Sequence, residues 1–299
     1  MTKVWIEAAL NGPWTRDKQK GIPVAVEEIV ADGIAAAAAG AAIVHAHAYD
    51  VTTGRQKDDW EIYARIIEGI RAKVDVIVYP TIPSPALGQA DTAQRFGHTA
   101  ELAKRGLIEW AVIDPGSVHF SRFDDLGQGG VYQNPHADIV EGMRISRAHN
   151  VHPSYAIYEP GFTRLGAALA AIAPVSPTPI YRFMFSDEFA WGFPPRAKHL
   201  DAHLALLGDV APGAPWMIAG LGVDIDPLIP EAVARGGHVR VGLEDARWGC
   251  GLSNETLVKN AARLVRSAGG EPASVADVRT TLRAIDNARG RVRTSISVP

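Results

Sequence analysis

The strongest constraint on the fold is a regular alternation of two kinds of segment along the 299-residue chain. Eight short apolar segments are rich in β-branched and aromatic residues, which is typical of buried strands. They cover residues 4–10, 42–48, 76–82, 110–113, 155–158, 180–185, 216–221 and 239–243. Segments with helical patterns lie between and after them, at residues 25–39, 60–72, 92–104, 139–149, 164–173, 197–207 and 227–234. Such alternation requires parallel strands joined by crossover helices.

Eight such units within about 250 residues predict a (β/α)8 barrel. Two more helices, at residues 254–268 and 275–287, would close the barrel and extend it at the carboxyl end. A doubly wound open sheet is the alternative. However, the first strand-to-helix connection, Asn11-Gly12-Pro13-Trp14, lacks a Gly-x-Gly-x-x-Gly pattern. Because no proline- and serine-rich linker divides the chain, we expect residues 1–299 to form one α/β domain.

Composition excludes several kinds of partner. The net charge of −3, without a clustered basic stripe, argues against nucleic acid. No segment reads as a membrane span, and the amino terminus does not have the form of a signal peptide. The single cysteine, Cys250, excludes internal disulfides and any multi-cysteine zinc site. We therefore expect a cytoplasmic protein that acts on small molecules, with a core drawn from the 47% of residues that are hydrophobic.

Two connections are long enough to serve as binding loops. Residues 114–136 follow the fourth predicted strand and are polar and glycine-containing, and we expect no regular structure there. Residues 186–199 follow the sixth strand and carry Trp191, Phe193, Arg196 and Lys198, a mixture suited to covering a ring and an anionic tail. Ordinary surface decoration is the competing explanation for both.

The pair His45 and His47 ends the second predicted strand, in the sequence Val44-His45-Ala46-His47. Successive strand side chains point to opposite faces, so these two imidazoles point to the same face. Neutral imidazole is costly to bury without partners, and the strand around the pair is otherwise apolar. A shared divalent metal ion is the favoured interpretation, and two locally hydrogen-bonded histidines are the alternative.

The eighth predicted strand offers a third ligand. Arg240, Gly242 and Glu244 share one face by the period of two. This strand lies two places from the second strand in a barrel, so Glu244 is expected to complete a site of two imidazoles and one carboxylate. Asp245 would either turn into the site or cap the next segment. Arg240 would hold Glu244 or Asp245, bind an anionic substrate, or form a purely structural ion pair.

Other polar residues are placed near the metal by their position at strand ends. Active sites of (β/α)8 barrels lie at the carboxyl ends of the strands. Some of these residues are expected to bind substrate, and others to fix the histidine tautomers. The candidates are Glu7 and Asn11 on the first strand, Tyr79 and Thr81 on the third, Asp114 and Ser117 after the fourth, and Glu159 after the fifth.

In the identity and order of these motifs, the chain resembles the β-keto acid cleavage enzymes, a family that includes 3-keto-5-aminohexanoate cleavage enzyme. The resemblance rests on Glu-Ala-Ala-Leu-Asn-Gly at residues 7–12, Val-His-Ala-His at 44–47, Tyr-Glu-Pro-Gly at 158–161, Ala-Gly-Leu-Gly at 219–222 and Gly-His-Val-Arg-Val-Gly-Leu-Glu-Asp at 237–245. It implies a zinc-dependent barrel that condenses a β-keto acid with acetyl-CoA, yielding acetoacetate and a new acyl-CoA. His45, His47 and Glu244 would match the zinc ligands, Asp245 the base and Arg240 its partner.

The chemistry implied by this resemblance suits such a site. Zinc would polarise the 3-keto group, and a base would remove a proton from the acetyl-CoA methyl group. The carbanion would then add to the polarised carbon. The resemblance also implies a homo-oligomer, with a tetramer as the expected form. Nickel or cobalt would suit the same ligands as zinc.

The chain departs from the family pattern at two places. Members that act on amino-substituted keto acids carry a glutamate in the first strand-to-helix loop, where this chain has Trp14. Trp14 favours an apolar substrate end or a quaternary ammonium held against the indole. A Ser-Thr pair at the end of the third strand is replaced by Pro80-Thr81, which removes a hydroxyl group.

Three other functions remain open from the residues alone. A hydrolase of the amidohydrolase type also uses a His-x-His strand, but on the first strand and with histidines after the fifth and sixth. Residues 180–185 contain no histidine. A retro-aldol lyase acting on an acyl-CoA is chemically closer, but its acid and arginine pattern on the first strand is absent. A non-catalytic metal-binding or ligand-binding barrel is the third possibility.

Overall fold

The computed structural model describes residues 1–83, 92–172 and 177–294. Its centre is an eight-stranded parallel sheet with the strand order β6-β3-β2-β13-β12-β11-β10-β7. The strands are β2 (Ile6–Ala9), β3 (Ile43–Ala46), β6 (Ile77–Pro80), β7 (Trp110–Val112), β10 (His152–Ile157), β11 (Ile180–Phe185), β12 (Trp216–Gly220) and β13 (His238–Val241). The edge strands β6 and β7 contact each other, so the sheet forms a nearly closed barrel. The predicted (β/α)8 barrel is confirmed.

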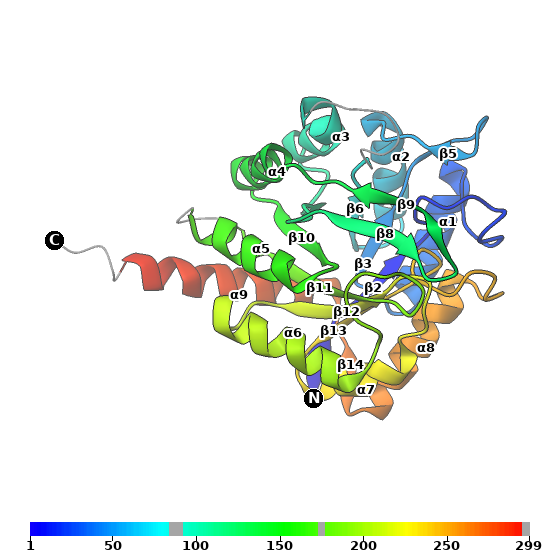
Figure 1. The fold of residues 1–299 in the computed structure, drawn as a ribbon. Coiled ribbons are helices and arrows are strands. Elements are labelled where there is room, and N and C mark those ends of the chain that lie inside the picture. Colours follow the sequence, from blue (N-terminus) through cyan, green and yellow to red (C-terminus); the bar gives the residue numbers. More distant parts are fainter. Residues whose placement is uncertain (84–91, 173–176, 295–299) are drawn as a thin grey trace.

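Helices surround the barrel, and most begin and end close to the predicted residues (Figure 1). They are α1 (Val26–Ala39), α2 (Trp60–Arg71), α3 (Thr92–Lys104), α4 (His136–His149), α5 (Pro160–Ile172), α6 (Ala197–Val210), α7 (Ile229–Ala234) and α8 (Asn254–Ser267), with a short 3-10 turn, η2 (Asp226–Leu228), before α7. Residue 173, the predicted end of the fifth helix, lies outside the described residues. No helix in the described ranges is both long enough and apolar enough to span a membrane.

The carboxyl-terminal helix α9 (Val275–Thr294) lies against the amino-terminal ends of the strands. Arg279 donates hydrogen bonds to Asp75 and Glu109, which precede β6 and β7. Asp286 accepts a 2.9 Å hydrogen bond from the backbone N–H of Thr178, which precedes β11. The short strand β1 (Thr2–Val4) pairs with β14 (Gly270–Pro272), just ahead of α9. The predicted carboxyl-terminal extension is present, and it leaves the other end of the barrel open for a site.

Two antiparallel hairpins stand at that other end, and neither was predicted. The strand β4 (Tyr49–Asp50) pairs with β5 (Arg55–Gln56), and β8 (Val118–Arg122) pairs with β9 (Asp125–Tyr132). The expectation that residues 114–136 lack regular structure is therefore wrong. Their glycine-rich, polar and largely exposed sequence hides the strand pattern, because neither face is buried along its full length. Residues 186–199 contact this hairpin through a bridge between Arg122 and Phe189.

The barrel interior is filled mainly by aromatic and branched side chains, and His238 is a titratable residue buried among them. Its ring stacks on Trp5, with 3.9 Å between ring centroids, and Nδ1 accepts a hydrogen bond from the Trp5 backbone N–H. Burial lowers the pKa of His238 to about 3. The unfolded chain takes up the proton below about pH 6.5, while the folded protein resists it, so stability falls as the pH is lowered through this window.

We predict that the His238→Asn variant loses less stability than the native protein between pH 7 and pH 5. Asparagine offers an oxygen acceptor near the position of Nδ1 but does not titrate. The shift predicts that His238 alone removes about 2 kcal/mol of stability from the native protein at pH 5. Urea unfolding at several pH values measures the difference. Parallel stability curves for the two proteins would contradict the assignment.

Candidate active site

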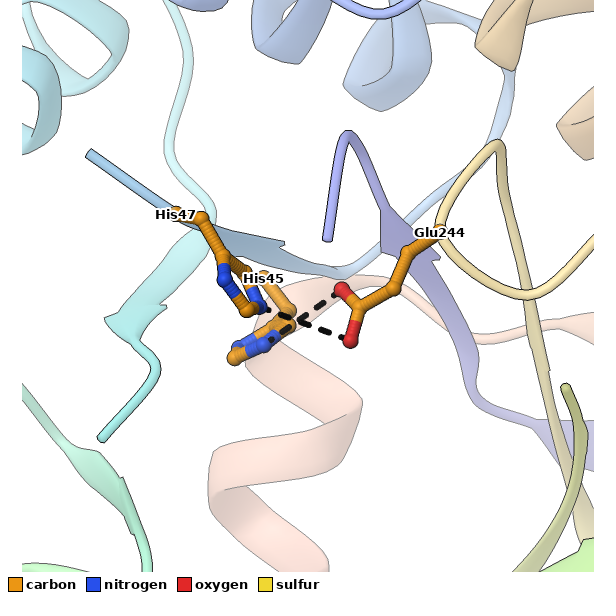
Figure 2. Close-up of side chains that lie close together, drawn as sticks. All are labelled: His45, His47 and Glu244. Carbon is orange, nitrogen blue, oxygen red and sulfur yellow. Dashed lines mark ion pairs between the residues drawn. The ribbon is translucent and has the colours of Figure 1, made fainter. Parts of the chain in front are cut away.

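Three side chains converge at the carboxyl ends of β3 and β13 (Figure 2). His45, His47 and Glu244 each offer one ligand atom, and these atoms lie within 4.8 Å of one another. The Nε2 atoms of His45 and His47 are each 3.5 Å from a different carboxylate oxygen of Glu244. All three residues are buried. Two imidazoles and one carboxylate around a common point are the donor set of a catalytic zinc site.

The backbone around His47 is held by Asn11, which lies just after β2. The Asn11 side-chain oxygen accepts a hydrogen bond from the His47 backbone N–H, and its amide nitrogen donates to the His47 carbonyl. Gln56 on β5 places its side-chain oxygen 2.8 Å from Nδ1 of His47. Because Nδ1–H donates to that oxygen, Nε2 keeps a free lone pair. In the described part of the chain, this buried Nε2 atom has no hydrogen-bond partner.

Glu244 reaches the cluster from a turn and not from a strand. The strand β13 ends at Val241, so the strand alternation predicted through residue 244 is wrong. Gly242 has a φ of +148°, and a Cβ there would lie 2.0 Å from the carbonyl oxygen of Ala9. The backbone N–H of Glu244 donates to that same carbonyl oxygen. A glycine at 242 therefore lets the chain turn against β2 and direct Glu244 toward the histidines.

We predict that Gly242→Ala is far more damaging than a matched glycine replacement. Gly236 also has a positive φ, of +76°, but a Cβ there would meet nothing within 4 Å. Gly236→Ala thus incurs only the conformational penalty, about 1 kcal/mol. Gly242→Ala adds a clash with backbone atoms and is expected to lose about 3 kcal/mol or more. Urea unfolding compares the two variants, and equal losses would contradict the assignment.

Arg240 on β13 joins the cluster to two further carboxylates. Its Nε and Nη2 atoms donate to the two oxygens of Asp245 at 2.8 Å and 2.9 Å. Nη2 also lies 2.8 Å from Glu244, and Nη1 donates to Glu7 at 3.0 Å. Glu7 in turn accepts a 2.6 Å hydrogen bond from the hydroxyl of Tyr79. The two-pronged contact with Asp245 fixes the orientation of that carboxylate beside the metal cluster.

Burial and charge set the protonation of these groups. Burial holds the pKa of His45 well below its ordinary value, so the imidazole stays neutral and able to ligate a metal. Burial acts to raise the pKa of Glu244, but Arg240 together with His45 and His47 outweighs burial and holds that pKa well below its ordinary value. Burial raises the pKa of Asp245 to about 6, with Arg240 opposing the rise. Asp245 is therefore a stronger base than an exposed aspartate.

The charge balance of the buried site fits a divalent cation. Two arginines and four carboxylates lie in or beside it, giving a net charge of −2 when all six are ionised: Arg182, Arg240, Glu7, Asp114, Glu244 and Asp245. An uncompensated charge of this size is costly away from water. A divalent metal ion among His45, His47 and Glu244 would offset it and would satisfy the unpartnered Nε2 of His47 and Oε2 of Glu244.

A cavity of about 260 Å³ opens beside the cluster. Of the predicted residues, it is lined by His45, His47, Glu244, Arg240, Trp14, Thr81 and Asp114. Trp14 is fixed by a 2.8 Å hydrogen bond from its indole N–H to the carbonyl oxygen of Glu244. Asp114 accepts hydrogen bonds of 2.7 Å from the hydroxyl of Tyr132 and from the backbone N–H of Ala156. The hairpin β8/β9 covers the cavity with Phe120, Gly130, Val131 and Tyr132.

Six predicted residues are not among the side chains that line this cavity, and two of them, Glu7 and Tyr79, are linked to Arg240 as described above. Asn11 holds the backbone of His47, as described above. Ser117 joins the base of the β8/β9 hairpin, where its hydroxyl accepts a hydrogen bond from the Asn134 backbone N–H. Glu159 accepts a hydrogen bond from the backbone N–H of Gly192 in the loop after β11. Asp245 is held by the two-pronged contact with Arg240, beside the cluster.

Sequence reasoning missed Arg182, Tyr132 and Tyr158, which also line the cavity. Arg182 lies on β11 and is 3% exposed. An arginine inside the apolar segment 180–185 was a visible signal for a functional group. Tyr132 and Tyr158 are brought together by the unpredicted hairpin and contact each other edge to face at 5.8 Å. No pattern along the chain connects them.

Comparison with known proteins shows relatives along almost the whole chain. The family model BKACE, beta-keto acid cleavage enzyme, matches residues 3–283. The 3-keto-5-aminohexanoate cleavage enzyme of Fusobacterium nucleatum subsp. nucleatum is 30% identical over 289 residues, covering 94% of this chain and 98% of that protein. The 3-dehydrocarnitine:acetyl-CoA trimethylamine transferase of Rhizobium meliloti (strain 1021) is 27% identical over 303 residues, covering 94% and 96%.

A solved structure of ObcA, in ternary complex with a C4-CoA adduct and oxalate, has a similar fold. Its TM-score is 0.67 at 15% sequence identity, and the match covers 88% of this chain and 67% of that chain. At this identity the likeness concerns the fold alone. The family match over residues 3–283, with a relative 30% identical over nearly its whole length, means that the chain belongs to the β-keto acid cleavage enzyme family.

Proposed function

We propose that this protein transfers an acyl group between a β-keto acid and acetyl-CoA, with zinc bound by His45, His47 and Glu244. In the overall reaction, R–CO–CH2–COO⁻ and acetyl-CoA give acetoacetate and R–CO–S-CoA. The observation that carries the proposal is the buried cluster of two histidines and a glutamate, with the Arg240–Asp245 pair beside it. Two relatives whose names include acetyl-CoA, the Rhizobium meliloti transferase and the 3-oxoadipate:acetyl-CoA acetyltransferase of Cupriavidus necator, support the acyl donor.

The balance of this reaction indicates which bonds change. The acetyl carbonyl carbon must leave the CoA sulfur and become bonded to C2 of the β-keto acid. The CoA sulfur must then bond to C3 while the bond between C2 and C3 breaks, and a proton returns to C2 in the acetoacetate product. The proton to be removed is therefore the one on C2, and this differs from the expectation that the acetyl-CoA methyl group is deprotonated. A bound zinc ion would polarise the 3-keto oxygen and make the C2 proton more acidic.

The residues of this chain supply the base and its support. We propose that Asp245 takes the C2 proton, since its raised pKa favours proton abstraction and Arg240 holds its two oxygens. Arg240 also offsets negative charge that develops on the substrate. Glu7 accepts hydrogen bonds from both Tyr79 and Arg240, and this contact helps to hold the Arg240 side chain in place. The cavity lining of Trp14, Thr81 and Asp114 is proposed to contact the substrate, while Asn11, Ser117 and Glu159 support the loops around it.

Product analysis tests this proposal. The zinc-loaded protein is incubated with a panel of β-keto acids, each with and without acetyl-CoA, and acetoacetate and acyl-CoA are measured. We expect both products in equal amounts, and only when acetyl-CoA is present. Cleavage without acetyl-CoA would favour a lyase, and an inactive panel with metal-loaded protein would contradict the proposal.

We also propose that the whole chain acts as one catalytic domain, as a homotetramer in the cytoplasm. The family resemblance supports this assembly. The mass of the native protein in solution, measured by light scattering, tests the tetramer directly. A monomeric mass would contradict it.

A further inference from the structure

Arg182 is a buried cation that makes no direct hydrogen bond or ion pair with the described residues, although the carboxylates of Glu7 and Asp114 lie near enough to interact with its charge. Its side chain is 3% exposed, and its Nε atom is buried with no hydrogen-bond partner. Within the described ranges, no hydrogen bond or ion pair of the Arg182 side chain is found. The other deeply buried arginines are fully engaged: Arg240 contacts Glu7, Glu244 and Asp245, and Arg95 contacts Asp138 and Asn134. A buried guanidinium whose N–H groups lack direct partners is unfavourable in the folded protein, so Arg182 is available to bind an anionic ligand that accepts those hydrogen bonds.

The position of Arg182 suits a substrate that also contacts the metal cluster. Its strand, β11, lies four places from β3 in the eight-strand order, which is the opposite wall of the barrel. Arg182 nevertheless lines the same cavity as His45 and Glu244. A small molecule in this cavity can therefore contact the cluster on one side and the guanidinium on the other.

Among the described residues that line the rest of the cavity, none offers a second free charge for a substrate tail. Its remaining walls are mainly apolar or aromatic, formed by Ile82, Val112, Phe120, Val131, Tyr158 and Leu221. The carboxylate of Asp114 also lines the cavity, but both of its oxygens already accept hydrogen bonds, from Tyr132 and Ala156. A tail that carried a charge would lose its hydration here without gaining a partner. An uncharged tail would instead bury apolar surface under the β8/β9 hairpin.

The Trp14 indole does not offer an open place for a substrate cation. The ammonium group of Lys18 already lies 5.6 Å from the centre of that ring and 5.1 Å from the ring of Trp248. A substrate ammonium beside Trp14 would meet this like charge. Of the two tails that Trp14 was expected to favour, the structure supports the apolar one.

We propose that Arg182 binds the carboxylate of the β-keto acid, and that the preferred substrates carry one carboxylate and an uncharged, bulky apolar tail. This inference rests on the proposed function, because it names the substrate class of the same site. Arg182 acts as a binding and specificity residue, distinct from the Arg240 and Asp245 pair. Its guanidinium would form two parallel hydrogen bonds with the carboxylate.

The test compares Arg182→Met with Arg182→Lys and with Arg164→Met, which removes an exposed arginine from the outer helix α5. The probe is 3-oxo-3-phenylpropanoate, with its uncharged methyl ester as the matched control ligand. We expect Arg182→Met to weaken binding of the acid, measured by calorimetry without acetyl-CoA, by about 100-fold. Binding of the ester is expected to change less than about 3-fold. Arg182→Lys should bind the acid more tightly than Arg182→Met but less tightly than the native protein. Arg164→Met should bind it as tightly as the native protein.

Two further readouts separate a binding role from a structural one. Methionine fills similar space without a charge, so Arg182→Met is expected to unfold at a higher temperature than the native protein. In turnover, the KM for the keto acid should rise by about 100-fold, while the KM for acetyl-CoA stays within about 3-fold. A structural arginine would give a less stable variant with unchanged KM, and that result would overturn the inference.

The apolar tail is tested with the dicarboxylate 3-oxoadipate against 3-oxo-3-phenylpropanoate. We expect a kcat/KM at least about 10-fold higher for the phenyl compound. A preference for 3-oxoadipate, or an effect of Arg182→Met on the dicarboxylate only, would overturn the assignment. If the native protein cleaves keto acids but Arg182→Met binds them normally, the inference fails and the proposed function stands. If binding depends on Arg182 but no turnover occurs, the proposed function fails instead.

Discussion

Replacing Asp245 by asparagine is expected to lower kcat by about 1,000-fold while leaving metal binding intact. Asparagine keeps the size of the side chain but cannot accept the C2 proton of the β-keto acid. Asp245 is not one of the three clustered ligands, so the metal content should remain that of the native protein. Arg240 would still pair with Glu7 and Glu244, which should keep the fold in place. Steady-state kinetics and elemental analysis on the same sample measure both quantities.

A matched control for this variant is Asp224→Asn. Asp224 is exposed and lies after β12, at the same end of the barrel, where its carboxylate accepts a local hydrogen bond from the backbone N–H of Asp226. Its replacement is expected to leave kcat and metal content unchanged. Native activity in Asp245→Asn would contradict the role of this residue as the base. Loss of the metal along with activity would instead assign Asp245 to the metal site.

Replacing Glu244 by glutamine is expected to remove both metal and activity. The amide keeps the volume of the carboxylate but is a neutral, weaker ligand, so metal affinity should fall by about 100-fold or more. The net charge of the buried site would also become less negative, which weakens its attraction for a divalent cation. Bound zinc is measured by elemental analysis after gel filtration in a metal-buffered solution. Activity should return only partly when excess zinc is added.

The control for this second variant is His203→Phe. His203 is buried like His45 but lies on α6, where its ring stacks on Phe183 at 4.5 Å and neither ring nitrogen has a hydrogen-bond partner among the described residues. Losing this histidine should leave the metal content unchanged. Full zinc occupancy in Glu244→Gln would show that Glu244 is not a ligand. Equal metal loss in both variants would point to a general effect on folding.

The barrel could be predicted because its signals are local. Apolar strands such as residues 180–185 and helical periods such as residues 60–72 repeat with little interruption, and the structure places β11 and α2 there within one residue. The β8/β9 hairpin escaped prediction because its strands are polar and contain Gly127, Gly129 and Gly130. Its pairing is decided by its position over the barrel mouth, which no local pattern encodes.

Only part of the candidate site could be predicted from the sequence, because some of its residues meet only through contacts between distant segments. The spacing of His45 and His47 along the chain predicts that their side chains lie together, and the structure places Glu244 beside them although the strand ends before it. Gln56 and Arg182 depend on contacts made across the fold. Gln56 reaches His47 from a short two-residue strand, and Arg182 faces the cluster from the opposite wall of the barrel. Such partners are determined by tertiary structure, so a single sequence shows their residue types but not their roles.

The most direct test of the central claim follows the acetyl group of acetyl-CoA labelled with carbon-13 at both acetyl carbons. The native, zinc-loaded protein is given this donor with an unlabelled β-keto acid, and the products are examined by carbon-13 NMR and mass spectrometry. The account predicts acetoacetate labelled at C3 and C4, together with an acyl-CoA whose acyl group is unlabelled. Unlabelled acetoacetate, or label in the acyl group of the new thioester, would contradict it.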